Sequence, residues 1–399
     1  MSSRIAMLLD NSFRPDLRVL REAETLIGMG HQVTIYAWDR DIEINRPALE
    51  ILKDIEVVRI AVKSKQQLGM RQIPYYLAYG WRVFWLVMCN QFDIVHCHDL
   101  PNLPIGVLLK VFKRIQLVYD AHEIHSIMEA KKYPKFVLWT IRSVEFFLLR
   151  WVDRLITVGP KRAKYYHDHY RERIFIAGNW YKARNKDQEL GKKYRKDLGI
   201  PPDAFVVSFS GTLSPIRCID ILVECASLFA NDKKPIYIII AGKGVLESKL
   251  SNLSGIHDHL RYVGWLEDLS PLFSASDAIV YIMDLSHPYS DYNSPNNLYL
   301  SIAWSIPLIG VNAGEIGEIL RSGENGILLN DVRVESVKDA IELLYETPEL
   351  RYNIAINLRK LQGQYSEEEF NKALYEAYRS ITQTDSNTPT SLSSCPNRG

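Results

Sequence analysis

The sequence predicts an α/β protein of two Rossmann-like, doubly wound domains that face each other across a cleft. Strand-like apolar runs alternate with segments of helical periodicity through both halves of the chain. A polar, basic stretch over residues 182–199 separates the halves, and 399 residues suffice for two domains of ordinary size. The formal net charge is +1, so no overall field favours nucleic acid as a partner.

Six strands are expected in the first domain, residues 1–181, with helical segments between them. The strands cover 4–9, 33–38, 93–96, 116–120, 154–158 and 174–177. The first helix, expected over 18–29, ends at Gly30, a residue common just after helices.

The second domain, residues 200–365, repeats this alternation. Its strands are expected over 205–210, 236–241, 261–264, 278–283, 307–311 and 326–329, several of them near-continuous apolar runs that suit parallel strands covered on both faces. Ser366 and Glu369 form a capping box that opens a last helix over 366–381, for which crossing back to the first domain is one arrangement. Residues 382–399 are rich in Ser, Thr, Asn and Pro, which predicts a disordered tail.

Two successive strands of the first domain end in histidines and carboxylates. The strand over 93–96 leads into His98 and Asp99, and the strand over 116–120 leads into His122 and Glu123. Ligands of open α/β sheets bind at the carboxyl ends of the strands, so this pair predicts a functional cleft. Polar strand ends or hydrogen-bonded core histidines remain the alternative.

Short motifs follow one another in a characteristic order along residues 4–381. They are Asp16-Leu17-Arg18-Val19, Gly30-His31-Gln32-Val33, residues 93–99 and 120–123, Ile156-Thr157-Val158-Gly159, residues 211–217 and 241–244, Val263-Gly264-Trp265 and Ser294-Pro295-Asn296-Asn297-Leu298. This order resembles the GT-B glycosyltransferases, specifically the retaining family 4 that uses nucleotide-activated sugars.

The resemblance implies roles for residues of the first domain. His122 and Glu123 become the catalytic candidates, with a neutral His122 imidazole beside the donor sugar and Glu123 bracing its loop. The acceptor-side candidates are Asp16, Arg18, His98 and Asp99. For Arg18, an ion pair with Glu22 one helical turn away is the simpler interpretation.

The resemblance also implies a donor site in the second domain. The residues implied for the phosphates are Gly211, Thr212, Arg217, Ser294, Asn296, Asn297 and Leu298. Those implied for the nucleotide base region are Gly242, Gly264 and Trp265. Backbone N–H groups at the start of a helix favour anions, which suits the segment 294–298 to a diphosphate.

The donor helix departs from the family pattern. The family's paired glutamates fall at Tyr292 and Leu300, its lysine at Asn297 and a glycine at Ser305, while Thr212 replaces a basic residue. Leucine cannot accept a hydrogen bond from a ribose hydroxyl, and losing that charged partner costs about 1.5–3 kcal/mol. Tyr292, Asn297 or Glu315 is the candidate for compensating it.

Two apolar segments indicate contact with a membrane surface. The segment 74–90 is short for a bilayer span and contains Arg82, which favours a buried or interfacial helix. The segment 131–154 is basic and aromatic, which suits a helix lying on an anionic bilayer and facing a lipid-linked acceptor. A buried helix with charged flanks is the alternative.

The expected function is transfer of a sugar from a nucleotide diphosphate donor to a hydroxyl of a surface-glycan or lipid-linked acceptor, with retention of configuration. No cofactor and no essential metal are expected. The five cysteines lack metal-ligand spacing and are typical of reduced thiols in a cytoplasmic protein, here with peripheral contact on the inner face of a membrane. The alternatives are a catalytically silent GT-B protein that binds glycan or scaffolds another transferase, and a GT-B sugar-nucleotide epimerase.

Overall fold

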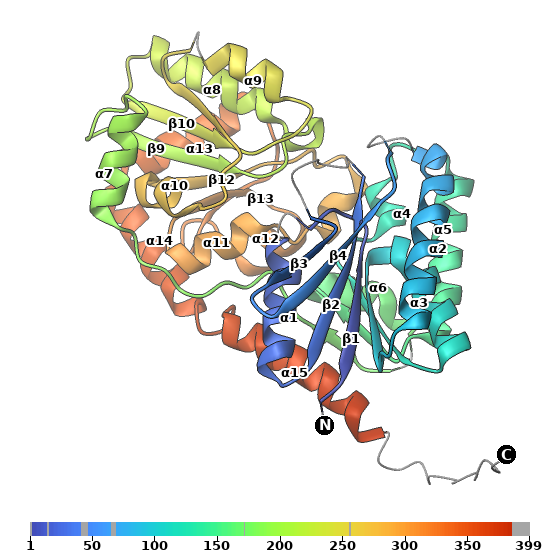
Figure 1. Cartoon of the computed structure of the whole chain (residues 1–399). Helices are drawn as coiled ribbons and strands as arrows, with labels where there is room; N and C mark the ends of the chain where they lie inside the picture. Colours follow the sequence, from blue (N-terminus) through green and yellow to red (C-terminus); the bar gives the residue numbers. More distant parts are fainter. Residues whose placement is uncertain are drawn as a thin grey trace, which may run out of the picture.

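The computed structural model describes residues 2–13, 16–40, 47–64, 69–170, 172–254 and 257–384. Each half of the chain is built on its own twisted sheet, and the two halves lie side by side (Figure 1). The predicted fold class, two doubly wound α/β domains, is confirmed.

The first sheet has the strand order β3-β4-β2-β1-β5-β6-β7-β8, in which β3 runs antiparallel to β4 and the other described pairings are parallel. Its strands are β1 (Arg4–Leu9), β2 (Gln32–Asp39), β3 (Leu49–Leu52), β4 (Ile55–Ala61), β5 (Ile94–His98), β6 (Gln116–Ala121), β7 (Arg154–Thr157) and β8 (Ile174–Ile176). The six predicted strands are confirmed, whereas β3 and β4 were not predicted.

Helices cover both faces of this sheet. The elements are α1 (Leu17–Gly28), η1 (Gly69–Gln72), α2 (Ile73–Cys89), α3 (Asp99–Lys113), α4 (His125–Met128), α5 (Lys135–Leu148), η2 (Leu149–Trp151), α6 (Pro160–His167) and α15 (Glu367–Thr384). One buried cluster joins α1 and α15 to the sheet, and a second joins α2, α3 and α6 to the opposite face.

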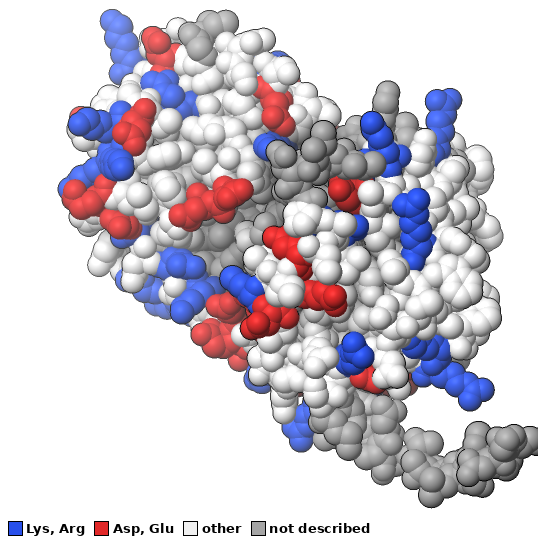
Figure 2. Space-filling view, in the orientation of Figure 1, with Lys and Arg blue, Asp and Glu red and all other residues white. Residues whose placement is uncertain are grey.

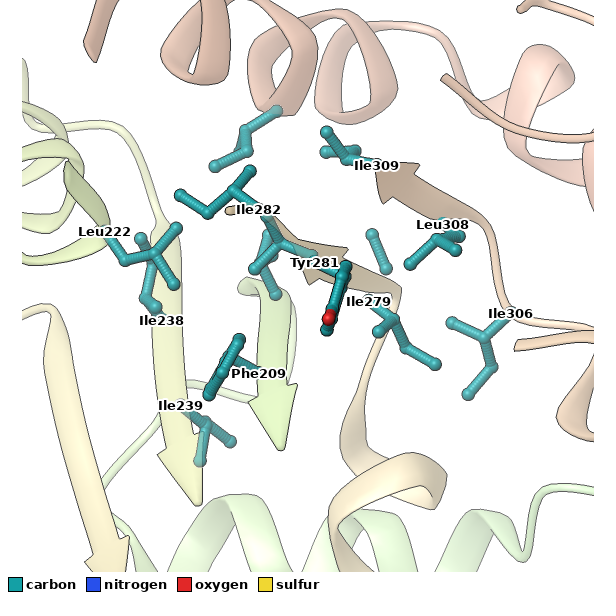
Figure 3. Packing of buried hydrophobic residues seen from close by; sticks show 14 of the residues in the cluster. Phe209, Leu222, Ile238, Ile239, Ile279, Tyr281, Ile282, Ile306, Leu308 and Ile309 are labelled. Atoms are coloured by element: carbon teal, nitrogen blue, oxygen red, sulfur yellow. The ribbon is translucent and has the colours of Figure 1, made fainter. Parts of the chain in front are cut away.

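The second sheet has the order β11-β10-β9-β12-β13-β14, with parallel pairings. Its strands are β9 (Phe205–Ser210), β10 (Ile236–Ala241), β11 (Leu260–Gly264), β12 (Ala278–Tyr281), β13 (Leu308–Val311) and β14 (Ile327–Leu329). The helical elements are α7 (Gln188–Asp197), η3 (Pro215–Arg217), α8 (Ile219–Asn231), α9 (Glu247–Ser254), α10 (Ser270–Ala275), η4 (Pro288–Tyr292), α11 (Asn296–Trp304), α12 (Gly314–Ile319), α13 (Val334–Glu346) and α14 (Pro348–Leu361). Isoleucines of β10, β12 and β13 fill the core around Phe209 (Figure 3), and all six predicted strands are confirmed.

The segment between the halves contains α7, which packs against α10 of the second half. A Cβ added to Gly191 would overlap the backbone of Ser274, so the two helices approach too closely for a larger residue. This part of the expected linker is therefore folded onto the second half.

The last helix, α15, returns to the first half, as Figure 1 shows. Phe370, Leu374 and Tyr378 are fully buried in the cluster that α1 forms with the first sheet. Ser366 Oγ accepts the backbone N–H of Glu369 at 3.2 Å, in agreement with the predicted cap. The helix continues to Thr384, and the rest of the predicted tail lies outside the described residues.

Among the described residues, no helix combines the length and the apolar character needed to cross a bilayer. The predicted helix over 74–90 is present as α2 and is half-buried, because Tyr79 and Val83 face the core while Leu77 and Trp81 are exposed.

Candidate active site

A cavity of about 630 Å³ lies between the two halves, at the carboxyl ends of both sheets. The side chains that line it from the first half include Asp10, Asp16, Arg18, Arg21, Arg40, His122, Glu123, Arg162 and Asn179. Those that line it from the second half are Lys243, Trp265, Ser294 and Asn296. The fold thus brings the predicted catalytic and acceptor-side segments opposite the predicted donor segments.

His122 follows β6 and is held by Asp120, the last carboxylate of that strand. Its Nε2 lies 2.6 Å from Asp120 Oδ2. Burial alone would lower the pKa of His122, but the charge of Asp120 outweighs it and raises the pKa to about 9. A pKa in this range favours the protonated imidazole at neutral pH, whereas the resemblance implied a neutral ring.

Arg18 projects from the first turn of α1, which Asp16 caps by accepting the N–H groups of Arg18 and Val19. The guanidinium lies 3.0 Å from Glu22 Oε1, so the predicted ion pair is present. It also lies 3.2 Å from Asp120 and 2.7 Å from Nε2 of His122. Arg18 therefore belongs to the same charged group as the catalytic candidate.

His98 and Asp99 lie behind the cleft wall. His98 is 3% exposed and does not line the cavity. Asp99 Oδ1 accepts the backbone N–H groups of His122 and Glu123, each at 2.9 Å, with its own backbone at a φ of +59°. Asp99 thus fixes the loop that carries both catalytic candidates.

Glu123 faces the second half of the molecule. Its Oε2 accepts the hydroxyl of Tyr289 at 2.6 Å and lies 3.3 Å from the guanidinium of Arg162. Arg162 also donates to the hydroxyl of Tyr289 at 3.0 Å and to the carbonyl of Tyr292 at 2.9 Å. Sequence reasoning missed Arg162 and Tyr289, although Arg162 closely follows the family-like segment that ends at Gly159.

Glycine loops end the central strands of the second sheet. Gly211 and Gly242 have φ values of +151° and +145°, and a Cβ on Gly242 would overlap the carbonyl of Gly211. Lys243 lies in the loop after β10 and reaches the cavity, and sequence reasoning did not single out this cation. Gly264 turns at a φ of +70° and delivers Trp265, which is 57% exposed.

Thr212 and Arg217 do not line the cavity. Thr212 is exposed, and Arg217 stacks 4.8 Å from the ring of Tyr281, where burial lowers its pKa. The next residue, Cys218, has a φ of +49°, a conformation that glycine adopts more easily.

The start of α11 presents Ser294 and Asn296 to the cavity, whereas the next two residues are engaged elsewhere. Asn297 bonds both the hydroxyl and the carbonyl of Ser210 on β9, at 2.9 and 2.7 Å. Leu298 is fully buried and its N–H bonds the carbonyl of Pro295 at 3.1 Å.

Glu315 supports the start of α11 through hydrogen bonds. Its Oε2 accepts hydroxyls of Ser294, at 2.6 Å, and of Tyr299. Burial raises the pKa of Glu315. Leu300 is only 8% exposed and packs in the core. Ser305 adopts a φ of +52°, a left-handed conformation that explains why the family pattern has a glycine at this position.

Comparison with known proteins adds an independent finding. A family model described as Glycosyltransferase Family 4 matches residues 17–181, and one described as Glycosyl transferases group 1 matches residues 191–361. EpsD of Bacillus subtilis strain 168, provisionally named a glycosyltransferase, is 24% identical over 343 residues, or 81% of this chain and 87% of its own. The D-inositol 3-phosphate glycosyltransferase of Rhodococcus erythropolis strain PR4 is 22% identical over 317 residues, or 73% of this chain and 68% of its own.

Solved structures support the fold. The crystal structure of Anabaena Alr3699/HepE in complex with UDP and glucose has a TM-score of 0.73 at 16% identity and covers 95% of this chain and 100% of that one. The adjoining family models, the relatives matched along most of the chain and the two-sheet fold together identify the protein as a GT-B glycosyltransferase of the family 4 type.

Proposed function

We propose that the protein moves a sugar from a nucleotide diphosphate donor to a hydroxyl of a surface-glycan or lipid-linked acceptor, with retention of configuration. The proposal rests on the make-up of one cavity, in which His122 and Arg18 face Lys243, Trp265 and Asn296. A nucleotide sugar requires cations and free amides for its diphosphate and a flat ring for its base, and the second half offers all three.

The diphosphate is expected between Lys243 and the start of α11. The first-turn N–H groups of a helix have no partner within the helix and favour anions. Because Leu298 uses its N–H on Pro295, the amides of Asn296 and Asn297 are the ones proposed for the phosphates. The neighbour Alr3699/HepE was solved with UDP and glucose, which makes a uridine diphosphate sugar the first donor to test.

The chemical step is proposed to use the charges of the first-half wall. Loss of the diphosphate leaves positive charge on the sugar and negative charge on the leaving oxygen. A protonated His122 beside Arg18 would stabilise that oxygen, because fixed charges in a protein cavity act more strongly than in solution. Glu123 positions the loop rather than the sugar, since its carboxylate is committed to Tyr289 and Arg162.

The acceptor is proposed to approach from a membrane surface. Helices α2, α3 and α5 lie next to one another and expose Trp81, Phe112 and Trp139 at 64%, 65% and 70%. The flank of the molecule that carries α2 and α5 is white with blue groups in Figure 2, so its charges are mainly basic. Exposed aromatic rings among cations suit the headgroup region of an anionic bilayer.

Calorimetric titration with UDP-, GDP- and ADP-sugars tests the donor site. One donor should bind, and Lys243→Ala should weaken it about tenfold or more, since a charge-assisted contact contributes about 1.5–3 kcal/mol. Lys249→Ala is the matched control, because Lys249 of α9 pairs at the surface with Asp220 of α8. Binding that is absent in a folded protein, or unaffected by Lys243→Ala, would reject the donor site.

Turnover and stereochemistry test the reaction. His122→Ala should lower turnover at least tenfold while leaving donor affinity within about twofold, because its charge acts on the leaving oxygen. The anomeric proton signal of the product should have the configuration of the donor. An inverted product would refute retention without affecting the donor assignment.

Vesicle sedimentation tests the membrane surface. Binding to vesicles with anionic lipid should fall in a Trp81→Ser/Trp139→Ser variant, and neutral vesicles should bind less than anionic ones. Trp265→Ser serves as the control, because Trp265 is similarly exposed but lies in the cleft. Equal binding of both variants would reject α2 and α5 as the contact.

A further inference from the structure

Four buried polar side chains converge beneath the cleft and do not line its cavity. They are Glu22 of α1, His96 and His98 of β5, and Asp120 of β6. Residues two apart on a strand point to the same face, so both histidines face α1 and α15 while Cys97 packs on the opposite face. Asp120 lies beside His98 in the strand register, which brings its carboxylate to the same point.

The facing atoms of these side chains have the separations of an ion-binding site. His96 Nε2 lies 3.8 Å from Glu22 Oε2 and 3.9 Å from Asp120 Oδ2. His98 Nδ1 lies 3.9 and 3.7 Å from the same two oxygens. Tetrahedral ligands about 2.1 Å from a zinc ion lie about 3.4 Å apart, so inward shifts of a few tenths of an ångström would complete the coordination.

Several of these atoms lack any hydrogen-bond partner within the part of the chain that the structure describes. They are His96 Nε2 and both ring nitrogens of His98, on side chains that are 0% and 3% exposed. Buried polar atoms are nearly always paired, so a cluster of unpaired atoms aimed at one another indicates a ligand between them.

The surroundings orient two of the four side chains. His96 Nδ1 lies 2.7 Å from the hydroxyl of Tyr378, which leaves Nε2 for the centre of the group. Asp120 contacts His122 and the guanidinium of Arg18. The same guanidinium pairs with Oε1 of Glu22, the oxygen that does not face the histidines. Such outer partners are typical of metal ligands.

We propose that Glu22, His96, His98 and Asp120 bind one divalent transition-metal ion of the zinc class. Two imidazole nitrogens and two carboxylate oxygens suit such an ion, whereas magnesium and calcium prefer oxygen ligands alone. Both carboxylates also pair with Arg18, so the ion would share them with that guanidinium. The sequence predicted no metal, because residues 22, 96, 98 and 120 become neighbours only in the fold.

The role of the ion is positioning. It would tie α1 to β5 and β6 and fix Asp120, the residue that holds His122 in the cleft. Because the group is buried below the cavity, the ion would touch neither donor nor acceptor. The site does not rest on the proposed function, and its test is independent of any sugar.

Elemental analysis of the full chain, purified without chelator or histidine tag, tests the site. About one equivalent of zinc per chain is expected, and a His96→Gln/His98→Gln variant should retain less than about a tenth of it. His167→Gln is the control, because His167 lies exposed beside Asp168 and resembles an adventitious surface site. A zinc content that falls in His167→Gln but not in the His96→Gln/His98→Gln variant would overturn the proposal.

Reloading gives a second readout. Chelator-treated protein should recover a thermal midpoint about 3 °C higher with Zn²⁺ and develop visible absorption with Co²⁺. If the double variant fails to fold, Glu22→Gln, which keeps the side-chain shape, takes its place and should lower the zinc content. A wild-type chain without zinc that responds to neither ion would also overturn the proposal.

Discussion

Tyr289→Phe is expected to weaken the contact between the two halves by about 2–3 kcal/mol. The hydroxyl of Tyr289 donates to Glu123 at 2.6 Å and accepts from Arg162 at 3.0 Å. A hydrogen bond to a charged group contributes about 1.5–3 kcal/mol, and Arg162 is 3% exposed, so little water replaces the lost partner. The side chain of Glu123 is 33% exposed, which reduces its share of the total.

A double-mutant cycle with Glu123→Gln isolates the hydrogen bond across the cleft. The coupling energy from denaturant unfolding is expected at about 1–2 kcal/mol. Because the two halves can unfold in separate steps, calorimetry should show that the lost unfolding free energy belongs to a transition in which both halves take part. Tyr352→Phe is the matched control, since Tyr352 is 69% exposed and should change stability by less than about 0.5 kcal/mol.

The same variant should open the cleft. Small-angle scattering should give a larger radius of gyration for Tyr289→Phe than for Tyr352→Phe, and a bound donor should reduce the difference. A coupling energy below about 0.3 kcal/mol, with identical scattering from both variants, would refute the idea that Tyr289, Glu123 and Arg162 hold the halves together.

Three further predictions concern single positions. His122 has a folded pKa of about 9 against an ordinary 6.5, so its protonation stabilises the folded protein fully below pH 6.5, and this contribution is lost as the pH rises through 9. In chelator-treated protein the loss should reach up to about 3 kcal/mol of unfolding free energy, and it should be missing from His122→Gln. A Cβ on Gly159 would overlap the carboxylate of Glu315, so Gly159→Ala should cost about 1–3 kcal/mol of unfolding free energy, whereas Gly28→Ala, with open space around it, should be nearly neutral. Cys218→Gly should raise unfolding free energy by about 0.5–1 kcal/mol, because it relieves a left-handed backbone, and an unchanged or lower value would contradict this.

The sequence predicted most of the fold because the parallel strands are buried on both faces and appear as apolar runs. The exceptions, β3 and β4, lie at the edge of the first sheet, where one face meets water. The run over Ile55–Ala61 alternates buried and exposed residues only in part, and the short β3 is partly exposed throughout. Neither has the continuous apolar character that identified the other strands.

The site was predictable where it depends on strand ends and not where it depends on contacts between distant segments. His122 and Trp265, which follow β6 and β11, line the cavity, as do Arg18 and Ser294 near the starts of two helices. The raised pKa of His122 was not predictable, because it comes from the contact with Asp120, a residue to which the sequence assigned no role of its own. Lys243 lies within the family-like segment 241–244, but no residue pattern around it indicated that its charge would face the cleft.

The geometry around His122 Nε2 allows only one of two hydrogen bonds at a time. The nitrogen lies 2.7 Å from Arg18 Nε, which can only donate, and 2.6 Å from Asp120 Oδ2, which as a carboxylate can only accept. With His122 protonated, Nε2–H must donate to Asp120, and Arg18 Nε is left to Glu22 Oε1 at 3.0 Å. The neutral ring can instead accept from Arg18, so proton loss changes the partner of Arg18 as well as the charge. The protonated arrangement sets two cations side by side on the cleft wall, which is the state that suits a departing diphosphate.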